Sequence, residues 1–173
     1  EKLNASANML TTEIKKANWD FYEKTLKGTQ KQKPANERAL GTVNGSVGEA
    51  LGKLYVDEMF PPEAKKKAEA MITNVIAAYK DRILALDWMS DDTKKLALVK
   101  LNAVTKKVAY PDKWKDYSSL DVDRSSYAQN VLRANIWHFN YQINKLGKPV
   151  DRTEWDMTPQ TYNAYYNPSN NEI

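Results

Sequence analysis

The chain contains no cysteine, only one histidine and no long apolar run. Without cysteine, no disulfide can stabilise the fold and no thiolate can bind a metal ion. A single imidazole is too few for a catalytic zinc centre, which normally takes three protein ligands. No apolar stretch approaches the roughly 18 residues that a membrane-spanning helix requires. These absences predict that the chain holds no metal and no catalytic residues for metal chemistry, and that it contains no membrane span.

Glycine is scarce, and its distribution is uneven. Four of the six glycines, Gly41, Gly45, Gly48 and Gly52, recur at steps of four, three and four. That spacing places them on one side of a helix. Inside a helix each glycine costs about 0.5–1 kcal/mol relative to alanine. We expect close approach of a neighbouring helix to offset this cost, and a groove left open for a ligand is the alternative.

The chain carries only a small excess of positive charge. The formal net charge is +4 and the pI is about 9.0, with lysines spread in short groups such as Lys65–Lys67. Nucleic-acid interfaces usually show a denser basic patch. We therefore interpret the lysines as solvated helix faces and expect no nucleic-acid partner. The 173 residues are enough for one domain with a core, and 42% hydrophobic content is typical of a folded protein.

Apolar periodicity predicts a mainly α, bundle-like fold of five helices. The first ends before Gly28, the second runs from Pro34 to Phe60, and the third covers residues 63–87. A fourth begins after the N-cap Ser90 and extends to Lys107, and a fifth covers residues 124–146. The predicted buried positions of the first helix are Leu3, Ala7, Leu10, Ile14, Ala17 and Phe21. Those of the second are Leu40, Val43, Val47, Ala50 or Leu51, and Leu54, and those of the third include Met71, Val75 and Tyr79.

Beyond Gly147 the helical period disappears. Residues 162–166 are rich in aromatic side chains and are followed by turn formers, which favours an extended strand. Residues 1–146 are thus predicted to form a helical domain and residues 147–173 an arm that leaves it. The aromatic side chains of the arm predict an exposed apolar patch, a feature that marks contact sites: Trp155, Tyr162, Tyr165 and Tyr166.

Other chemistries find no support in the sequence. His138 lies in a predicted helix between two aromatic residues, and we interpret it as a structural residue. No serine motif accompanies it for nucleophilic catalysis. The glycines of the second helix follow no strand and lack the Lys-Ser/Thr ending of a phosphate-binding loop.

Four sequence blocks, in order, resemble the neprilysin-like (M13) zinc metallopeptidases. They are residues 48–56, residues 89–100, residues 110–114, and residues 147–152 joined to 155–173. The resemblance implies a thermolysin-like zinc domain paired with a mostly helical domain, which together enclose a cavity that admits small peptides. Residues 1–146 are similar to part of the helical domain, and residues 147–173 resemble the crossing into the catalytic domain.

The same resemblance implies a substrate-binding segment. Asn163 and Ala164 match the Asn-Ala pair that binds the substrate backbone in the family, and Tyr165 continues that segment. An exposed backbone edge can accept an extended peptide as an additional strand. The family's His-Glu-x-x-His helix is absent from these 173 residues. We therefore expect zinc in the intact enzyme, no cofactor in this chain, and no peptidase activity from this chain alone.

The expected partners are a peptide substrate and the catalytic domain of the same polypeptide, and pairing of two copies through the arm is a further option. The start at Glu1 and the end at Ile173 suggest an excised segment. A version without cysteine resembles bacterial members, so the expected location is periplasmic, cell-surface or secreted, with the cytoplasm as the alternative. The rival function is a non-enzymatic helical module that binds a protein partner through its aromatic arm.

Overall fold

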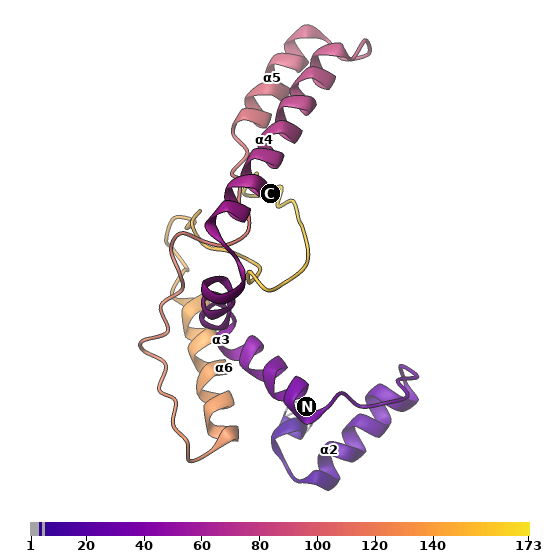
Figure 1. Ribbon diagram of the computed structural model, residues 1–173, viewed down its shortest axis with the longest axis vertical. Helices are drawn as coiled ribbons and strands as arrows, with labels where there is room; N and C mark the ends of the chain where they lie inside the picture. The colour runs from indigo at the N-terminus through magenta and orange to yellow at the C-terminus, as the bar shows by residue number, and fades with distance from the viewer. Residues whose placement is uncertain (1–3, 5) are drawn as a thin grey trace. The chain divides into compact units, whose positions relative to one another are not determined.

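The computed structural model describes residue 4 and residues 6–173. Within them the fold is mainly α, as predicted, and no β-strand forms. The elements, shown in Figure 1, are η1 (Ala7–Met9), α2 (Thr12–Trp19), the π-helical η2 (Asp20–Thr25), α3 (Ala35–Met59), α4 (Pro62–Ala85), α5 (Asp91–Asn102) and α6 (Tyr127–Ile143).

Several helix ends confirm the sequence signals. The Ser90 hydroxyl accepts a hydrogen bond from the Thr93 backbone N–H at 3.3 Å and caps α5. Pro61 precedes α4, where its fixed φ suits the entry into a helix. Gly28 and Gly147 both have φ of 73°, a left-handed conformation that glycine adopts without strain. Each of these two glycines lies shortly after a helical segment, as predicted.

Two predicted helices are wrong in extent. The first is interrupted at Leu10, which is extended, and it continues as α2 and then as η2; its predicted member Leu3 lies outside the described residues. The fourth ends at Asn102 rather than at Lys107. The reason is a competing backbone pairing, because the N–H groups of Thr105 and Lys107 donate to the carbonyls of Asn171 and Ile173.

Helix α3 is not continuous. Val47 has φ of −139° and ψ of 44°, which breaks the helical path inside the element. Residue contacts divide the chain at almost the same place into two compact units. One unit contains the described residues up to Gly48 together with Asp116–Pro149, and the other contains Glu49–Lys115 with Val150–Ile173. The division predicted from the sequence, into a helical domain of residues 1–146 and an arm of residues 147–173, stays a prediction.

In the first unit, α6 contributes a cluster of aromatic contacts. The ring of Trp137 stacks on Tyr141 at 5.2 Å between centroids and lies 4.8 Å from Tyr117. Its indole N–H donates to the Ser119 hydroxyl at 2.9 Å. Ala134, one helical turn before His138, is almost completely buried. These contacts connect α6 to the loop that precedes it.

In the second unit, α4 and α5 lie side by side (Figure 1). The Lys94 ammonium donates to the Leu84 carbonyl at 3.0 Å and so satisfies an acceptor near the end of α4. The loop after α5 packs on the start of α4, where Lys65 donates to the Tyr110 carbonyl and pairs with Asp112 at 2.8 Å.

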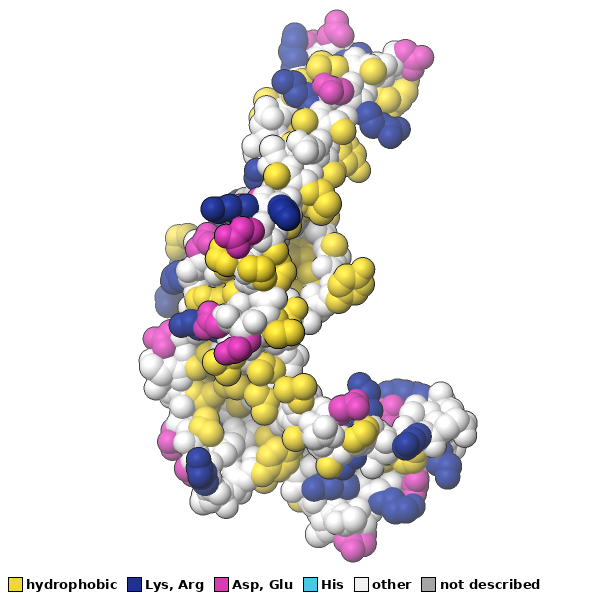
Figure 2. All heavy atoms as spheres, viewed as in Figure 1, with side chains coloured by type: hydrophobic (Ala, Val, Ile, Leu, Met, Phe, Trp, Pro, Cys, Tyr) yellow, Lys and Arg dark blue, Asp and Glu magenta, His cyan; other side chains and the backbone are white. Residues whose placement is uncertain are grey.

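Much of the predicted apolar core is exposed in this chain. Met71 and Tyr79 of α4 are 59% and 58% exposed, and Leu40 and Leu54 of α3 are also exposed. Figure 2 shows hydrophobic side chains on the surface between charged ones. The prediction that these helix faces are buried is therefore wrong within this chain, because each helix has too few described neighbours to cover its apolar stripe.

Candidate functional site

The candidate site is the non-helical segment of residues 154–173, which belongs to the second unit. The strand predicted for residues 162–166 is not formed among the described residues. An extended segment counts as a strand only when a neighbour pairs with its backbone, and here none does. Two anchors instead hold the segment, one before Asn163 and one after Tyr165.

The first anchor is the approach of Pro159 and Gln160 to Gly52 on α3. A Cβ atom placed on Gly52 would lie 2.7 Å from the Cδ of Pro159 and 2.7 Å from the Oε1 of Gln160. The glycine therefore permits a contact that no other residue would allow. This confirms the expected close approach at one position, although a loop rather than a helix makes it. At Gly41 and Gly45 the same expectation is wrong, because an added Cβ would meet nothing within 4 Å.

The second anchor is a short pairing between residues 105–107 and the end of the chain. Thr105 donates to the Asn171 carbonyl at 2.9 Å and accepts from the Ile173 N–H at 3.0 Å. Lys107 donates to the Ile173 carbonyl at 2.7 Å. Asn167 and Glu172 also exchange backbone hydrogen bonds, at 2.9 and 3.2 Å, and thereby close the turn between them.

Charged side chains reinforce the second anchor. The ammonium of Lys107 lies 2.7 Å from the Oε2 of Glu172, and the two side chains are only 5% and 1% exposed. Lys107 also donates to the carbonyl of Glu154, at the start of the segment. A buried carboxylate needs such a partner, since an isolated charge is strongly disfavoured away from water.

Between the anchors, Asn163 and Ala164 are exposed and adopt no helix. The Asn163 side-chain oxygen accepts a hydrogen bond from the Ala164 N–H at 2.8 Å. Their carbonyl groups make no hydrogen bond to other described residues. Tyr162, immediately before them, is fully exposed. This stretch therefore offers backbone acceptors and a side-chain amide to a ligand.

Tyr165 faces the other way. Its side chain is half-buried, and its hydroxyl donates to the Oε1 of Glu172 at 3.3 Å. Burial raises the pKa of Tyr165 to about 12, and the negative charges of Glu172 and Asp156 act in the same direction. Of the three sequence-predicted site residues, Asn163 and Ala164 are thus open to a ligand, whereas the phenol of Tyr165 is engaged within the chain.

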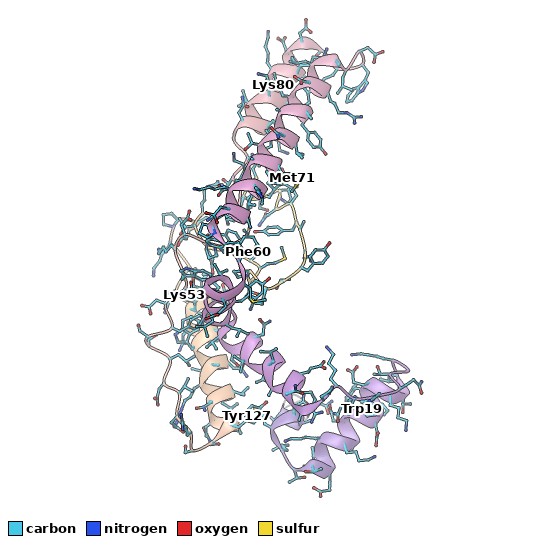
Figure 3. All side chains as sticks on the ribbon, in the orientation of Figure 1. Trp19, Lys53, Phe60, Met71, Lys80 and Tyr127 are labelled. Atoms are coloured by element: carbon cyan, nitrogen blue, oxygen red, sulfur yellow. The ribbon has the colours of Figure 1, made fainter. Side chains whose placement is uncertain are left out.

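An apolar cavity lies against this segment. Its volume is about 300 Å³, and its lining includes Asn163 and Ala164. Phe60 and Met71, labelled in Figure 3, contribute from the link between α3 and α4 and from α4 itself. Trp155 and Met157 contribute from the segment. Polar backbone groups and apolar surface therefore occur together at this place, a combination typical of peptide and small-molecule sites.

The described residues show no side-chain arrangement typical of a zinc site. In the described part of the chain, no group of three or more His, Cys, Asp or Glu side chains is arranged to hold a metal ion. The Nε2 of His138 lies 2.9 Å from the Ser46 carbonyl, and its ring contacts Trp137 edge-on. Across residues 4 and 6–173, no helix has the length and apolar character of a membrane span.

Sequence reasoning missed Lys107 and Glu172. The sequence predicts Lys107 at the end of a helix and Glu172 only as part of the arm, and nothing in their local patterns indicates burial. Their pairing depends on a contact between segments that are more than sixty residues apart in the sequence. The importance of Gly52 was signalled by the glycine spacing, but its partner was not.

Comparisons with known proteins agree on one family. The model described as "Peptidase family M13" matches residues 2–111. "Neutral endopeptidase" of Lactobacillus helveticus is 34% identical over 99% of this chain and 27% of its own length. "Neprilysin-3" of Drosophila melanogaster is 31% identical over 95% of this chain and 22% of its own length. The chain therefore spans about a quarter of the length of these relatives.

Solved structures give the same result. Mycobacterium tuberculosis zinc metalloprotease Zmp1, in complex with an inhibitor, is 43% identical and superposes with a TM-score of 0.90, covering 99% of this chain and 26% of that one. PepO from Lactobacillus rhamnosis HN001 is 26% identical with a TM-score of 0.89, covering 98% of this chain and 27% of that one.

Proposed function

The chain belongs to peptidase family M13, and from this premise we propose that it is the non-catalytic part of a zinc metalloendopeptidase that hydrolyses small peptides. In this proposal the helices wall the substrate cavity. Asn163, Ala164 and the backbone of Tyr165 bind the main chain of the peptide. Zinc is bound by residues of the same polypeptide outside this chain, and the 173 residues alone cleave no peptide.

The observation that carries the proposal is the exposed backbone of Asn163 and Ala164. A peptide in extended conformation presents alternating N–H and C=O groups, and it binds best to a backbone edge whose groups have no partner. The Asn163 amide can donate and accept at once, which matches a peptide group. The hydrogen bond from the Ala164 N–H to Asn163 Oδ1 keeps the amide near the backbone until a ligand replaces it.

The anchors on both sides support the same proposal. Binding an extended peptide to a mobile loop would require ordering that loop, which weakens affinity. Here the contact at Gly52 and the pairing at residues 105–107 hold the segment before any peptide arrives. Binding energy is then available for the peptide itself.

The test is the kinetics of Asn163→Ala in the full-length, zinc-loaded protein, with a quenched fluorescent peptide that the wild type cleaves. Removing one hydrogen bond that is equal in ground and transition states raises KM by about tenfold and leaves kcat nearly unchanged. Asn170→Ala is the matched control, because it removes the same side chain from the same segment outside residues 163–165.

Two results would contradict the proposal. An Asn163→Ala variant with the KM of the wild type would show that the segment does not bind the peptide. A full-length protein that cleaves no peptide, but binds a protein partner through residues 154–173, would favour the non-enzymatic module instead.

A further inference from the structure

Glu172 occupies an unusual place for a charged residue. It is 1% exposed, and it contacts three different parts of the second unit. Its Oε2 pairs with Lys107, its Oε1 accepts from the Tyr165 hydroxyl, and its backbone pairs with Asn167. One side chain therefore connects the loop after α5 to the segment that contains Asn163 and Ala164.

The connection runs directly to the candidate site. Tyr165 is the residue after Ala164, so a restraint on its side chain also restrains the backbone of its neighbour. Lys107 extends the connection to the beginning of the segment through the Glu154 carbonyl. These contacts link Glu154 to Tyr165 through Lys107 and Glu172, and the backbone between Glu154 and Tyr165 completes the ring.

We propose that Lys107 and Glu172 are positioning residues, which hold the Asn163–Tyr165 segment in the conformation that binds the backbone of a peptide substrate. This inference rests on the proposed function, and it adds which contacts keep the segment in one conformation. The ion pair acts through Tyr165, whose hydroxyl stays protonated as a donor because its pKa is about 12. Lys107 also lines the apolar cavity, but its side chain is 5% exposed and that of Glu172 is 1% exposed, so in this proposal both residues act through the segment.

A buried ion pair can also serve stability alone, and the two roles differ in an observable way. Replacing both partners by apolar residues of similar size often leaves stability unchanged or higher, because no charge remains buried without a partner. The same replacement removes the acceptor of Tyr165 and so releases the segment. Substrate binding then suffers although the fold does not.

The experiment uses the full-length, zinc-loaded protein with the double substitution Lys107→Met and Glu172→Leu, assayed on a peptide that the wild type cleaves. We expect an unchanged thermal midpoint and a KM raised by about tenfold, with kcat changed by less than about threefold. Tyr165→Phe keeps the ion pair but removes the hydroxyl, and we expect a smaller rise in KM. It tests the same claim if the double variant does not fold.

The control is a second buried pair in the same unit. Glu49 and Lys115 are paired at 3.1 Å, with side chains 7% and 16% exposed. The double substitution Glu49→Leu and Lys115→Met removes a comparable pair that does not touch residues 163–165. We expect it to leave KM unchanged.

The outcomes separate the two claims. If the wild type cleaves the peptide and neither Lys107→Met/Glu172→Leu nor Tyr165→Phe changes KM, the positioning role is wrong and the proposed function stands. The role is also wrong if KM rises equally in the Glu49/Lys115 control. If the full-length wild type cleaves no peptide, the proposed function fails, and the positioning role fails with it.

Discussion

At the scale of single residues, Asp123 shows how local hydrogen bonds set the charge of a side chain. Its carboxylate accepts from the hydroxyl and the backbone N–H of Ser125, and it pairs with the Arg133 guanidinium at 2.6 Å. The hydrogen bond from the Ser125 side chain, followed by that from Arg133, holds the pKa of Asp123 well below its usual range. The ionised form is thus favoured in the folded state.

This predicts an acid-dependent contribution to stability. Because the folded-state pKa of Asp123 is lowered, its contribution is fully present above the unfolded pKa of about 4 and is lost as the pH falls through the folded value. Asp123→Asn should lower the thermal midpoint at pH 7, and the difference from wild type should shrink below about pH 4. Thermal unfolding across this pH range measures it.

Asp121→Asn provides the control for Asp123. Asp121 also faces Arg133, but at 3.7 Å and with a side chain that is 81% exposed, so we expect a much smaller effect. Equal effects of the two substitutions at pH 7 would contradict the account of Asp123.

Tyr165 gives a prediction of opposite sign. Its pKa is raised to about 12, so its contribution to stability is present below the unfolded pKa of about 10 and is lost as the pH rises through about 12. The difference between the ultraviolet titrations of wild type and Tyr165→Phe should show one phenol that ionises only near pH 12. A difference curve centred near pH 10 would mean that the hydroxyl is open to water.

At the scale of elements, the contact between α3 and the C-terminal segment depends on Gly52. Gly52→Ala would place a methyl group 2.7 Å from the rigid ring of Pro159, which cannot move aside as a flexible side chain can. We expect a loss of about 1–3 kcal/mol in the free energy of unfolding, as for other overpacked contacts. Chemical denaturation of the full-length protein measures this loss.

Gly41→Ala is the matched change in the same helix. A Cβ at Gly41 meets nothing within 4 Å, so only helix propensity changes, and we expect a gain of about 0.5–1 kcal/mol. Two substitutions of the same type in one helix should therefore act in opposite directions. Destabilisation by both would show that α3 needs backbone freedom at more than one glycine.

The elements also show how far sequence reasoning reaches. Ser90, Pro61, Gly28 and Gly147 mark helix ends correctly, because caps, prolines and left-handed glycines act within a few residues. The early end of α5 and the break at Val47 were not predictable in this way. The first depends on pairing with residues 171–173. The second lies among Gly45, Ser46 and Gly48, which weaken a helix but do not fix the residue at which it bends.

The candidate site shows the same difference between features set by local sequence and features set by long-range contacts. Asn163 and Ala164 were predicted from their resemblance to a family motif, and the structure leaves them exposed. The orientation of Tyr165 and the pairing of Lys107 with Glu172 were not found. Burial of a charge pair depends on which segments meet in space, and periodicity within either segment carries no information about that meeting.

At the scale of the whole molecule, exposed apolar side chains agree with the coverage of the relatives. Large apolar residues on α4 and α5, such as Tyr79 and Leu96, are more than half exposed. The chain corresponds to only 26% of the length of the inhibitor-bound M. tuberculosis zinc metalloprotease. We expect the rest of the polypeptide to cover these faces, since exposed apolar surface of this kind usually marks an interface.

The central claim is that residues 163–165 bind the backbone of a peptide substrate. The most direct measurement is an experimental structure of the full-length, zinc-loaded protein with a bound peptide inhibitor. The account predicts that the Asn163 amide and the backbone of Ala164 lie within hydrogen-bond distance, about 2.7–3.2 Å, of the inhibitor's main chain. A bound inhibitor that contacts neither residue would contradict it.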